Sequence, residues 1–373
     1  MRIVVLGAGF GGLELATRLS EALGDELDLV LVDRTDAFVF GFSKLDVMFG
    51  RTSAEAVHHP YASLSRPGVR FLQADVLAID PATRLVTTSA GQLQGDALVL
   101  ALGVDLVPSE TPGLLEAGYE FYTEEGAFAL AEVLAAFPGG RVVIGVTSTP
   151  FKCPPAPSET ALLVHDFLVA RGVRDRSTVS LVMPLPVPIP PSPVASEAVL
   201  AMFAERDIAW HAGKLVQALD PATRTARLSD GTAMPFDLFL GVPKHRAPAV
   251  VVEAGLTEDG WVPVDPQTLE TRFPDVWAVG DVTSVGTPKA GVFAEGQAAV
   301  VATQLLARLR GEEPQSYDGH GTCWMEVGHG EIAKVDVTFV PGRPPQGSME
   351  GPSAALMEDK GAFGSTRVAR WFG

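Results

Sequence analysis

The pattern of apolar and polar positions predicts strands and helices in alternation. Short apolar runs, beginning with Ile3-Val4-Val5-Leu6, are followed by segments of helical spacing, beginning with residues 10–22, and turn-forming residues separate the two kinds of segment. Further strands are predicted over 27–32, 69–79, 85–88 and 96–100. This alternation is typical of α/β proteins and disfavours a helix bundle or a β-sandwich.

The same order of elements occurs again in the middle of the chain. A predicted helix over 124–137 ends at Pro138-Gly139-Gly140, and a strand over 141–146, a helix over 158–170 and a strand over 178–183 follow it. The repeated strand–helix–strand order at the start of both regions indicates a duplicated Rossmann-like unit. Prolines interrupt the next apolar stretch between 184 and 193, which predicts a stiff extended loop.

Length and charge narrow the class of protein. At about 150 residues per domain, 373 residues predict two or three domains, and 47% apolar residues are enough for a core in each. The formal net charge of −17 opposes binding to nucleic acid and to anionic lipid. No apolar run approaches the roughly 20 residues of a spanning helix, and Met1-Arg2 leads directly into a strand, which predicts a cytoplasmic protein without a leader peptide.

Cysteine is the scarcest residue with redox chemistry. Cys153 and Cys323 are the only two, and their separation of 170 positions excludes a disulfide scaffold and a cysteine-rich zinc module. The histidines are scattered without metal-ligand spacing, so no metal site is expected. The residues alone leave open whether the two cysteines are redox-active or small buried apolar side chains.

A glycine-rich turn stands at the start of the chain. Gly7-Ala8-Gly9-Phe10-Gly11-Gly12 fits GxGxxG directly after a strand and at the start of a helix, the context in which the motif indicates dinucleotide binding. Gly7 permits the tight turn, Gly9 lets a pyrophosphate approach, and Gly12 allows close packing of helix on strand. Asp33, at the end of the second strand, is placed to accept the ribose hydroxyls of an adenosine.

Two later segments indicate which dinucleotide binds. Val276-Trp277-Ala278-Val279-Gly280-Asp281 resembles the second FAD fingerprint of flavoprotein reductases with two dinucleotide-type domains, and Ala101-Leu102-Gly103 resembles their Ala-Thr-Gly crossover. A plain strand-ending turn is the alternative for Gly280-Asp281. The resemblance implies FAD at the first site, held by the following residues: Gly7, Gly9, Phe10, Gly11, Gly12, Asp33, Arg34, Ser43, Val76, Ala101, Gly103, Gly280, Asp281, Lys289 and Ala290.

The predicted architecture is accordingly α/β with two Rossmann-like domains, arranged as in glutathione reductase, plus a short C-terminal segment. The FAD-binding domain is discontinuous and takes residues 1–110 and 255–310, the latter with a strand over 276–279 and a helix over 290–309. Residues 111–254 form the second domain. Residues 311–373 form a C-terminal segment expected to cap the flavin and face the electron acceptor.

The second Rossmann-like unit lacks the motif that a nicotinamide cofactor needs. The strand over 141–146 is followed by Thr147-Ser148-Thr149-Pro150-Phe151-Lys152-Cys153-Pro154-Pro155, whose prolines cannot form an amide cradle for a pyrophosphate. The next strand ends in Val182-Met183-Pro184, without a carboxylate for a ribose. The nucleotide motif of this domain is therefore degenerate.

The segment around Cys153 carries a more specific resemblance. Thr149 to Pro157 resembles the Pro-x-Lys-Cys-x-x-Ala-Pro segment of sulfide:quinone oxidoreductases and of the flavoprotein subunit of flavocytochrome c sulfide dehydrogenase. Cys323 stands where this family has its second redox cysteine. Similar segments are Phe40-Gly41-Phe42-Ser43, Pro243-Lys244-His245-Arg246-Ala247-Pro248 and Pro288-Lys289-Ala290-Gly291.

This resemblance implies a Cys153/Cys323 disulfide or polysulfide bridge beside the flavin. Sulfide would attack one sulfur and leave a persulfide, and two electrons would pass through FAD to a quinone or another small acceptor. Lys152 is expected to lower the thiol pKa of its neighbour Cys153, and Lys289 to stabilise the reduced flavin. Glu159 and Glu295 are candidate proton relays, with helix-surface charges as the alternative.

Some positions depart from the family pattern. There is no third cysteine and none near residues 40–43, so FAD is expected to be noncovalent. Lys44 stands where a proline is common, and the residues around Cys323 read Gly321-Thr322-Cys323-Trp324 instead of Thr-Ser-Cys-Pro. Because of these departures, the resemblance leaves the range of substrates open.

The C-terminal tail, residues 339–373, is the segment from which we judge membrane contact. Residues 339–361 are expected to be loop-like, which leaves only 362–373 for a short amphipathic anchor. Such a segment predicts at most weak peripheral contact with the inner face of the membrane. In the alternative, Trp371 and Phe372 cap the core or a homodimer interface.

The sequence thus predicts an FAD-dependent oxidoreductase similar to sulfide:quinone oxidoreductases. Two alternatives stay open. One is a flavoprotein like the type II NADH dehydrogenases, which requires a working second glycine loop. The other is a flavin-binding redox partner or sensor without sulfide turnover.

Overall fold

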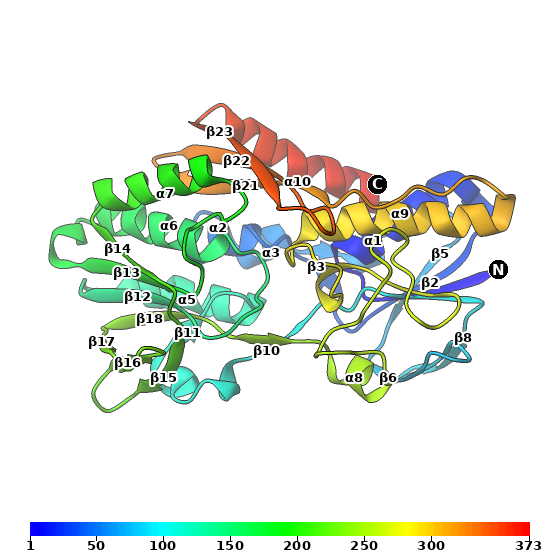
Figure 1. Ribbon diagram of the computed structural model, residues 1–373, viewed down its shortest axis with the longest axis horizontal. Helices are drawn as coiled ribbons and strands as arrows, with labels where there is room; N and C mark the ends of the chain where they lie inside the picture. Colours follow the sequence, from blue (N-terminus) through cyan, green and yellow to red (C-terminus); the bar gives the residue numbers. More distant parts are fainter.

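The computed structural model describes residues 1–373 and consists of two α/β units joined side by side, with a C-terminal layer lying across both (Figure 1). The first unit is built on a five-stranded sheet in which every pair of neighbours is parallel. Its order is β20 (Val276–Ala278), β9 (Ala97–Leu100), β1 (Arg2–Leu6), β2 (Asp28–Asp33) and β5 (Val69–Gln73).

Both faces of this sheet are covered, which explains why its strands are apolar throughout. Ile3 and Val5 pack toward helices α1 (Phe10–Leu23) and α9 (Gly291–Arg310), whereas Val4 and Leu6 pack toward the opposite face. That opposite face carries a three-stranded antiparallel sheet and helix α8 (Ala249–Glu253). The three strands are β6 (Val76–Asp80), β7 (Leu85–Thr88) and β8 (Gly91–Gln94).

The second unit repeats this plan. Its parallel sheet has the order β11 (Tyr119–Glu120), β18 (Leu238–Val242), β12 (Arg141–Val146), β13 (Thr178–Met183) and β14 (Ile208–Ala212). It is covered by helices α5 (Glu124–Ala136), α6 (Ala156–Ala170) and α7 (Pro193–Glu205), and by an antiparallel sheet of β15 (Val216–Asp220), β16 (Thr225–Leu228) and β17 (Ala233–Pro235).

Short elements connect the two units. The antiparallel pair β10 (Asp105–Val107) and β19 (Lys244–Arg246) forms the crossing between them. The α-helices and strands not yet named are β3 (Ala37–Phe38), β4 (His59–Pro60), α2 (Ser43–Met48), α3 (Ala54–Val57) and α4 (Leu114–Ala117).

The predicted α/β fold is confirmed, and β12 and β13 have the bounds expected from the sequence. The segment that follows β13 contains a helix that we did not predict. Residues 184–192 form a loop, but Pro193 opens α7, and the Ser192 side chain accepts a hydrogen bond from the Ala195 amide at 3.2 Å. Serine at the N-cap followed by proline at the first helical position was a readable signal for this helix.

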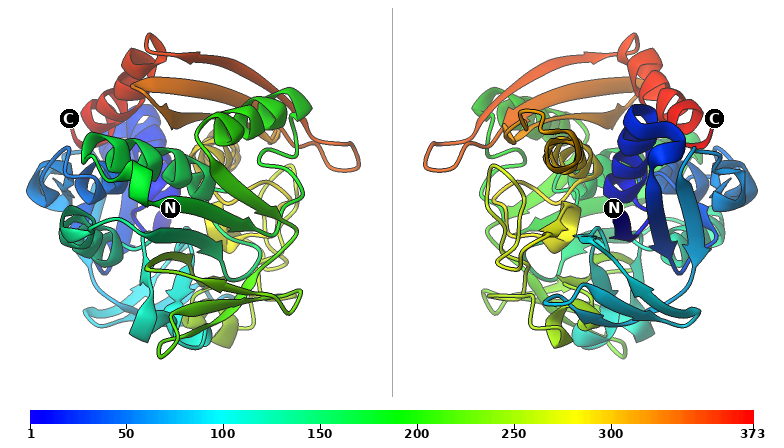
Figure 2. Two further views of the ribbon diagram at one scale, coloured as in Figure 1. Left: turned by 90° about the vertical axis from the view of Figure 1, so that its left-hand side faces the viewer. Right: turned by 90° about the vertical axis from the view of Figure 1, so that its right-hand side faces the viewer.

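The tail differs from the expectation for residues 339–361. It forms an antiparallel sheet of β21 (His320–Gly328), β22 (Glu331–Thr338) and β23 (Gln346–Ser353), followed by α10 (Leu356–Phe372). Figure 2 shows this sheet and helix along one side of the molecule. The glycines, serines and Pro352 of β23 disfavour strands, so its composition does not predict one. It forms an edge strand because it pairs with β22.

Trp371 on α10 is fully buried instead of being available to a membrane. Its ring lies 5.8 Å from that of Phe10 and 5.5 Å from that of Phe38. For Trp371 the alternative from the sequence is confirmed, because α10 turns this tryptophan into the core against α1. None of the helices combines the length and apolar character needed to cross a membrane.

Candidate active site

A cavity of about 710 Å³ lies where the first unit, the second unit and the C-terminal layer meet. The strands β1, β2, β9 and β20 all lead into it at their carboxyl ends, the edge at which open α/β sheets bind ligands. Its volume falls in the range of about 300–1,000 Å³ that is usual for ligand and cofactor sites. The cavity is therefore the candidate active site.

The glycine-rich turn forms one end of the cavity. Gly7 has a φ of +102°, and a Cβ there would lie 2.3 Å from the carbonyl oxygen of Ala101. A Cβ on Gly12 would lie 1.9 Å from the carbonyl oxygen of Gly7, so α1 can approach the turn only with glycine at this position. Gly9 has no neighbour within 4 Å of such a Cβ and lines the cavity. This open face at a helix N-terminus fits a pyrophosphate.

Asp33 fixes the turn against the end of β2. Its carboxylate accepts hydrogen bonds from the Ala8 amide at 2.7 Å and from the Thr35 amide and hydroxyl at 2.9 and 2.8 Å. A carboxylate has about four lone-pair sites, so acceptor capacity remains toward the cavity that Asp33 lines. The Asp33 carboxylate can therefore accept hydrogen bonds from the hydroxyls of a ribose beside the pyrophosphate.

Most of the residues expected to contact FAD line this one cavity. Gly12 lies behind the turn, and Ser43 begins α2, whose neighbours Phe42 and Lys44 reach the wall in its place. The residues that the structure does bring to the wall are Gly7, Gly9, Phe10, Gly11, Asp33, Arg34, Val76, Ala101, Gly103, Gly280, Asp281, Lys289 and Ala290.

Lys289 lines the cavity just before α9. Its ammonium donates to the carbonyl oxygens of Asp281 at 2.5 Å and Thr283 at 2.9 Å, and it lies 3.5 Å from the centre of the Trp261 ring. Burial lowers the pKa of Lys289 to about 8, so it is mostly charged at neutral pH. A cation held at the start of α9 suits the negative charge of a reduced flavin.

Cys153 enters the cavity from the second unit on a constrained backbone. Its φ is +50°, uncommon for a residue other than glycine. Its amide donates to the Lys289 carbonyl oxygen at 2.6 Å, and its own carbonyl oxygen accepts from the Ala156 amide at 2.9 Å. The first bond fastens the loop after β12 to the first unit at the start of α9, and the second closes a turn within the loop; Cys153 lines the wall of the cavity.

Cys323 reaches the same cavity from β21, where it is paired with Val335 of β22. Both cysteines are free thiols. Cys153 is exposed at the cavity wall, whereas Cys323 is half-buried. Loss of contact with bulk water raises the pKa of Cys323 to about 12 and also raises that of Cys153, with further contributions from Cys323 and Glu159 to the latter. The net pKa shift of Cys153 is thus upward, opposite to the lowering expected from Lys152, because the enclosed surroundings and the nearby negative charges disfavour the thiolate.

Glu159 is buried beside the two thiols instead of lying on a helix surface. It is 5% exposed, and its carboxylate accepts a hydrogen bond from the Glu326 amide at 2.9 Å. Burial raises the pKa of Glu159 to about 7, although Lys360, at 3.9 Å, works in the opposite direction. A group of this kind can take up and release a proton near neutral pH.

Glu295 does not share this position. It forms a two-pronged ion pair with Arg367 of α10 at 2.6 and 2.7 Å, and it is absent from the wall of the large cavity. The candidate role of Glu295 as a proton relay is replaced by a structural one, that of holding α10 against α9.

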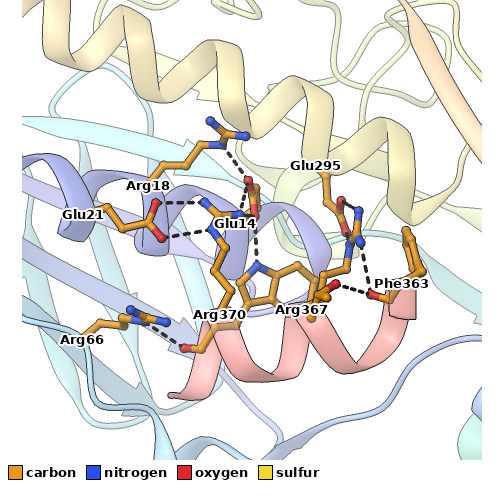
Figure 3. A network of polar contacts seen from close by, with 10 residues as sticks. Glu14, Arg18, Glu21, Arg66, Glu295, Phe363, Arg367 and Arg370 are labelled. Carbon is orange, nitrogen blue, oxygen red and sulfur yellow. Dashed lines mark hydrogen bonds and ion pairs between the residues drawn. The ribbon is translucent and has the colours of Figure 1, made fainter. Parts of the chain in front are cut away.

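A second ion-pair group fixes α10 against α1 (Figure 3). The carboxylate of Glu14, 3% exposed, accepts from the Arg370 guanidinium at 2.7 and 2.9 Å, from the Trp371 indole at 2.9 Å and from Arg18 at 2.6 Å. Arg370 also reaches Glu21, which is far more exposed. The clamp, defined as the Glu14 and Glu295 ion pairs, seats α10 along the first unit.

Because α10 is seated in this way, it contributes an aromatic corner to the cavity. Phe363 lies 4.8 Å from the Trp324 ring and 6.2 Å from the Phe42 ring, and the Lys360 ammonium lies 5.2 Å from the centre of Phe42. All four line the cavity. Sequence reasoning missed the site roles of Trp324, Lys360 and Phe363, and only the position of Trp324 next to Cys323 pointed to one.

The loop after β12 runs from the second unit to the first unit. A Cβ on Gly145 would lie 2.7 Å from both Phe239 and Val216, so side chains of the second unit fill the space beside this glycine. Thr147 is bound through its amide and its hydroxyl to the Val242 carbonyl oxygen at 3.0 and 2.9 Å. The chain then leads to Cys153 at the first unit, so this strand end carries a cysteine loop in place of a glycine cradle.

Residues 1–304 match the family described as pyridine nucleotide-disulphide oxidoreductase, and the chain belongs to that family. It is an FAD-dependent oxidoreductase, as the glycine-rich turn and the Gly280-Asp281 segment predicted.

Among its relatives, the mitochondrial sulfide:quinone oxidoreductase of Mus musculus is 23% identical over 359 residues, covering 91% of this chain and 79% of the relative. The sulfide-quinone reductase of Aquifex aeolicus is 27% identical, covering 84% and 78%. The NADH dehydrogenase-like protein Rv1812c of Mycobacterium tuberculosis is 30% identical, covering 76% and 73%.

Solved structures agree in fold. The sulfide:quinone oxidoreductase of Aquifex aeolicus superposes with a TM-score of 0.87 at 24% identity, covering 100% of this chain and 91% of that one. NDH2 of Plasmodium falciparum gives a TM-score of 0.75 at 12% identity, covering 100% and 96%. The resemblance to sulfide:quinone oxidoreductases indicated by the sequence motifs is confirmed, and relatives of the NADH dehydrogenase kind are present too.

Proposed function

We propose that this protein oxidises sulfide at a Cys153/Cys323 redox pair and passes two electrons through FAD to a quinone or a similar small acceptor. One observation carries the proposal. The only two cysteines of the chain, 170 positions apart, line the same cavity as the glycine-rich turn. Two cysteines that served only as small core residues would have no reason to share the wall of a cofactor site.

The sulfur chemistry requires the pair in its disulfide form. Hydrosulfide attacks one sulfur, the S–S bond breaks, and the products are a persulfide on one cysteine and a thiolate on the other. Joining the persulfide and the thiolate into a trisulfide releases two electrons and one proton. Bound FAD supplies the two-electron acceptor for this step. Glu159, with a pKa of about 7 and its charge acting on both thiols, is placed to take the proton.

The aromatic corner is the proposed site of the electron acceptor. Phe42, Trp324 and Phe363 offer flat apolar surfaces to a ring such as a quinone, while the Lys360 ammonium beside them favours the negative charge that develops on reduction. Sulfide and acceptor would then use different parts of one cavity.

Reduction by NADH is the second candidate function, since relatives named as NADH dehydrogenase-like proteins match this chain. The course of the loop after β12 argues against it, because a proline-rich cysteine loop takes the place of the glycine cradle. The purified FAD-loaded protein, kept anaerobic, separates the two functions when sulfide and NADH are added to separate samples and flavin absorbance is followed.

We expect sulfide, and not NADH, to bleach the flavin. Cys153→Ser and Cys323→Ser should each abolish this bleaching while FAD stays bound, and Met325→Leu, a conservative change on the strand that carries Cys323, should retain it. Bleaching that survives in either cysteine variant would refute the redox pair. Bleaching by NADH alone would establish the second candidate, and bleaching by neither would leave a flavin-binding redox partner or sensor.

A further inference from the structure

The lysines of this chain divide into two groups. There are seven, and four of them pair with carboxylates, namely Lys214, Lys244, Lys334 and Lys360. The other three, Lys44, Lys152 and Lys289, have no carboxylate partner, and all three line the large cavity. In a chain with 45 acidic and only 28 basic residues, this concentration of unpaired cations sets the cavity apart from the rest of the molecule.

Lys44 is held close to Cys153. It projects from α2, and its ammonium donates to the carbonyl oxygen of Tyr122. Tyr122 is 4% exposed, and its hydroxyl lies 3.5 Å from the Cys153 carbonyl oxygen. Burial and the charge of Lys152 lower the pKa of Lys44, and two glutamates and Cys153 work in the opposite direction; the net pKa is about 7.

Neither of those glutamates neutralises Lys44. Glu120 is occupied by the Tyr122 amide at 2.7 Å and by the amide and hydroxyl of Thr123. Glu124 is paired with His58. The Lys44 ammonium therefore keeps donor capacity that the protein itself does not satisfy, since an ammonium has three donors.

Lys152 adds a second positive charge to the wall of the cavity, and this charge acts on Lys44. It directly precedes Cys153 and forms no ion pair or side-chain hydrogen bond of its own. Its charge disfavours the charged forms of Lys44 and His245 and favours that of Asp281. Two ammonium groups that repel each other beside the Cys153 thiol are costly to keep unless an anion joins them.

We propose that Lys44 and Lys152 form an anion-binding subsite beside Cys153, which takes a small sulfur-bearing anion. On the proposed function, the anion is the sulfur substrate, so the two lysines would select hydrosulfide or polysulfide and hold it next to the sulfur that it attacks. The proposal concerns binding alone, and it therefore does not depend on turnover. Lys289 is not part of this subsite, because two of its three donors bind the carbonyl oxygens of Asp281 and Thr283 and its ammonium lies over the Trp261 ring.

Thiocyanate is a suitable probe, since it is a small anion with a terminal sulfur and does not reduce flavins. Its dissociation constant for the oxidised, FAD-loaded protein is measured by calorimetry and by the flavin difference spectrum. We expect Lys44→Met and Lys152→Met each to raise this constant by about tenfold or more, since a hydrogen bond to a charged group contributes that much. Lys44→Arg should stay within about threefold, because it keeps the charge.

Lys214→Met is the matched control, since Lys214 is paired with Asp230 at 2.7 Å outside the cavity, and it should leave the constant unchanged. Absence of thiocyanate binding to the unmodified protein, or equal weakening in the control, would overturn the subsite. If the lysine variants shift the flavin reduction potential but not thiocyanate affinity, the lysines serve FAD and the proposal is wrong. If Lys44→Met does not fold, Lys152→Met decides the matter alone.

A protein that binds thiocyanate through these lysines but is not bleached by sulfide would retain the subsite and refute the proposed function. The two failures are thus distinguishable.

Discussion

Replacing Glu14 with glutamine should loosen the C-terminal helix without unfolding the rest of the protein. Glu14 is the buried half of the clamp, and its carboxylate accepts two hydrogen bonds from Arg370 and one from the Trp371 indole. The amide is nearly isosteric, but its NH2 group faces donors. The substitution therefore removes the charge and leaves buried donors without acceptors.

The size of the effect follows from these contacts. A hydrogen bond to a charged group contributes about 1.5–3 kcal/mol, and breaking a buried ion pair costs about 3–5 kcal/mol. Arg370 keeps its bonds to Glu21 at 3.0 and 3.1 Å, which places the expected loss at the lower end. We expect the docking of α10 to weaken by about 3 kcal/mol, which corresponds to roughly a hundredfold increase in the population of the undocked helix.

Hydrogen exchange measured by mass spectrometry on residues 356–372 reports this undocking directly. Glu21→Gln is the matched control, because Glu21 pairs with the same arginine but is 45% exposed, and it should cost no more than about 1 kcal/mol. Equal acceleration of exchange in the two variants, or none in Glu14→Gln, would refute the assignment of Glu14 as the main anchor. Since α10 carries Lys360 and Phe363, reoxidation by a quinone should slow in Glu14→Gln more than bleaching by sulfide does.

The contact between Glu14 and Arg370 should also make the docking of α10 depend on pH. Burial works to raise the pKa of Glu14, but hydrogen bonds from Arg370 and Trp371 outweigh it, and the net shift is downward from the ordinary value of 4.5. The stability that Glu14 contributes is therefore present above about pH 4.5 and is lost as the pH falls below that value. Exchange in α10, corrected for its intrinsic pH dependence, should accelerate in acid in the unmodified protein and change far less in Glu14→Gln.

Other predictions concern the cavity. Gly12→Ala should abolish FAD binding or folding, because the new Cβ would lie 1.9 Å from the Gly7 carbonyl oxygen. Gly9→Ala should fold normally and weaken FAD binding by about tenfold or more. Fluorescence titration of the refolded apoproteins with FAD measures both effects. A Gly9→Ala protein that binds FAD as tightly as the parent would argue against pyrophosphate approach at this turn. Glu159→Gln should lower the pKa of both thiols, because the Glu159 charge helps to raise them, so alkylation by iodoacetamide at pH 9 should accelerate by about threefold or more. An unchanged alkylation rate would show that Glu159 does not act on the thiols.

Features that depend on neighbouring residues could be predicted well. The turn at Gly7 to Gly12, the strand end at Asp33 and the Gly280-Asp281 segment were readable because each motif combines a backbone requirement with a strand or helix directly beside it. The tail was predicted poorly, since β23 is made of residues that favour turns and becomes a strand only by pairing with β22. For the same reason the sequence left open whether Trp371 contacts a membrane or caps the core, and the docking of α10 decided it.

The sequence by itself determined the α/β fold, the dinucleotide turn and the absence of a glycine cradle in the second unit, because periodicity and the conformational limits of glycine and proline act over short distances along the chain. Only the tertiary structure decided which distant groups meet. It brought Cys153 and Cys323 to one cavity, buried Glu159 beside them, and placed Lys44 near Lys152 with no carboxylate to pair with. Charges and pKa values at such a site depend on burial and on neighbours from other elements, and packing of the two units and the C-terminal layer sets both.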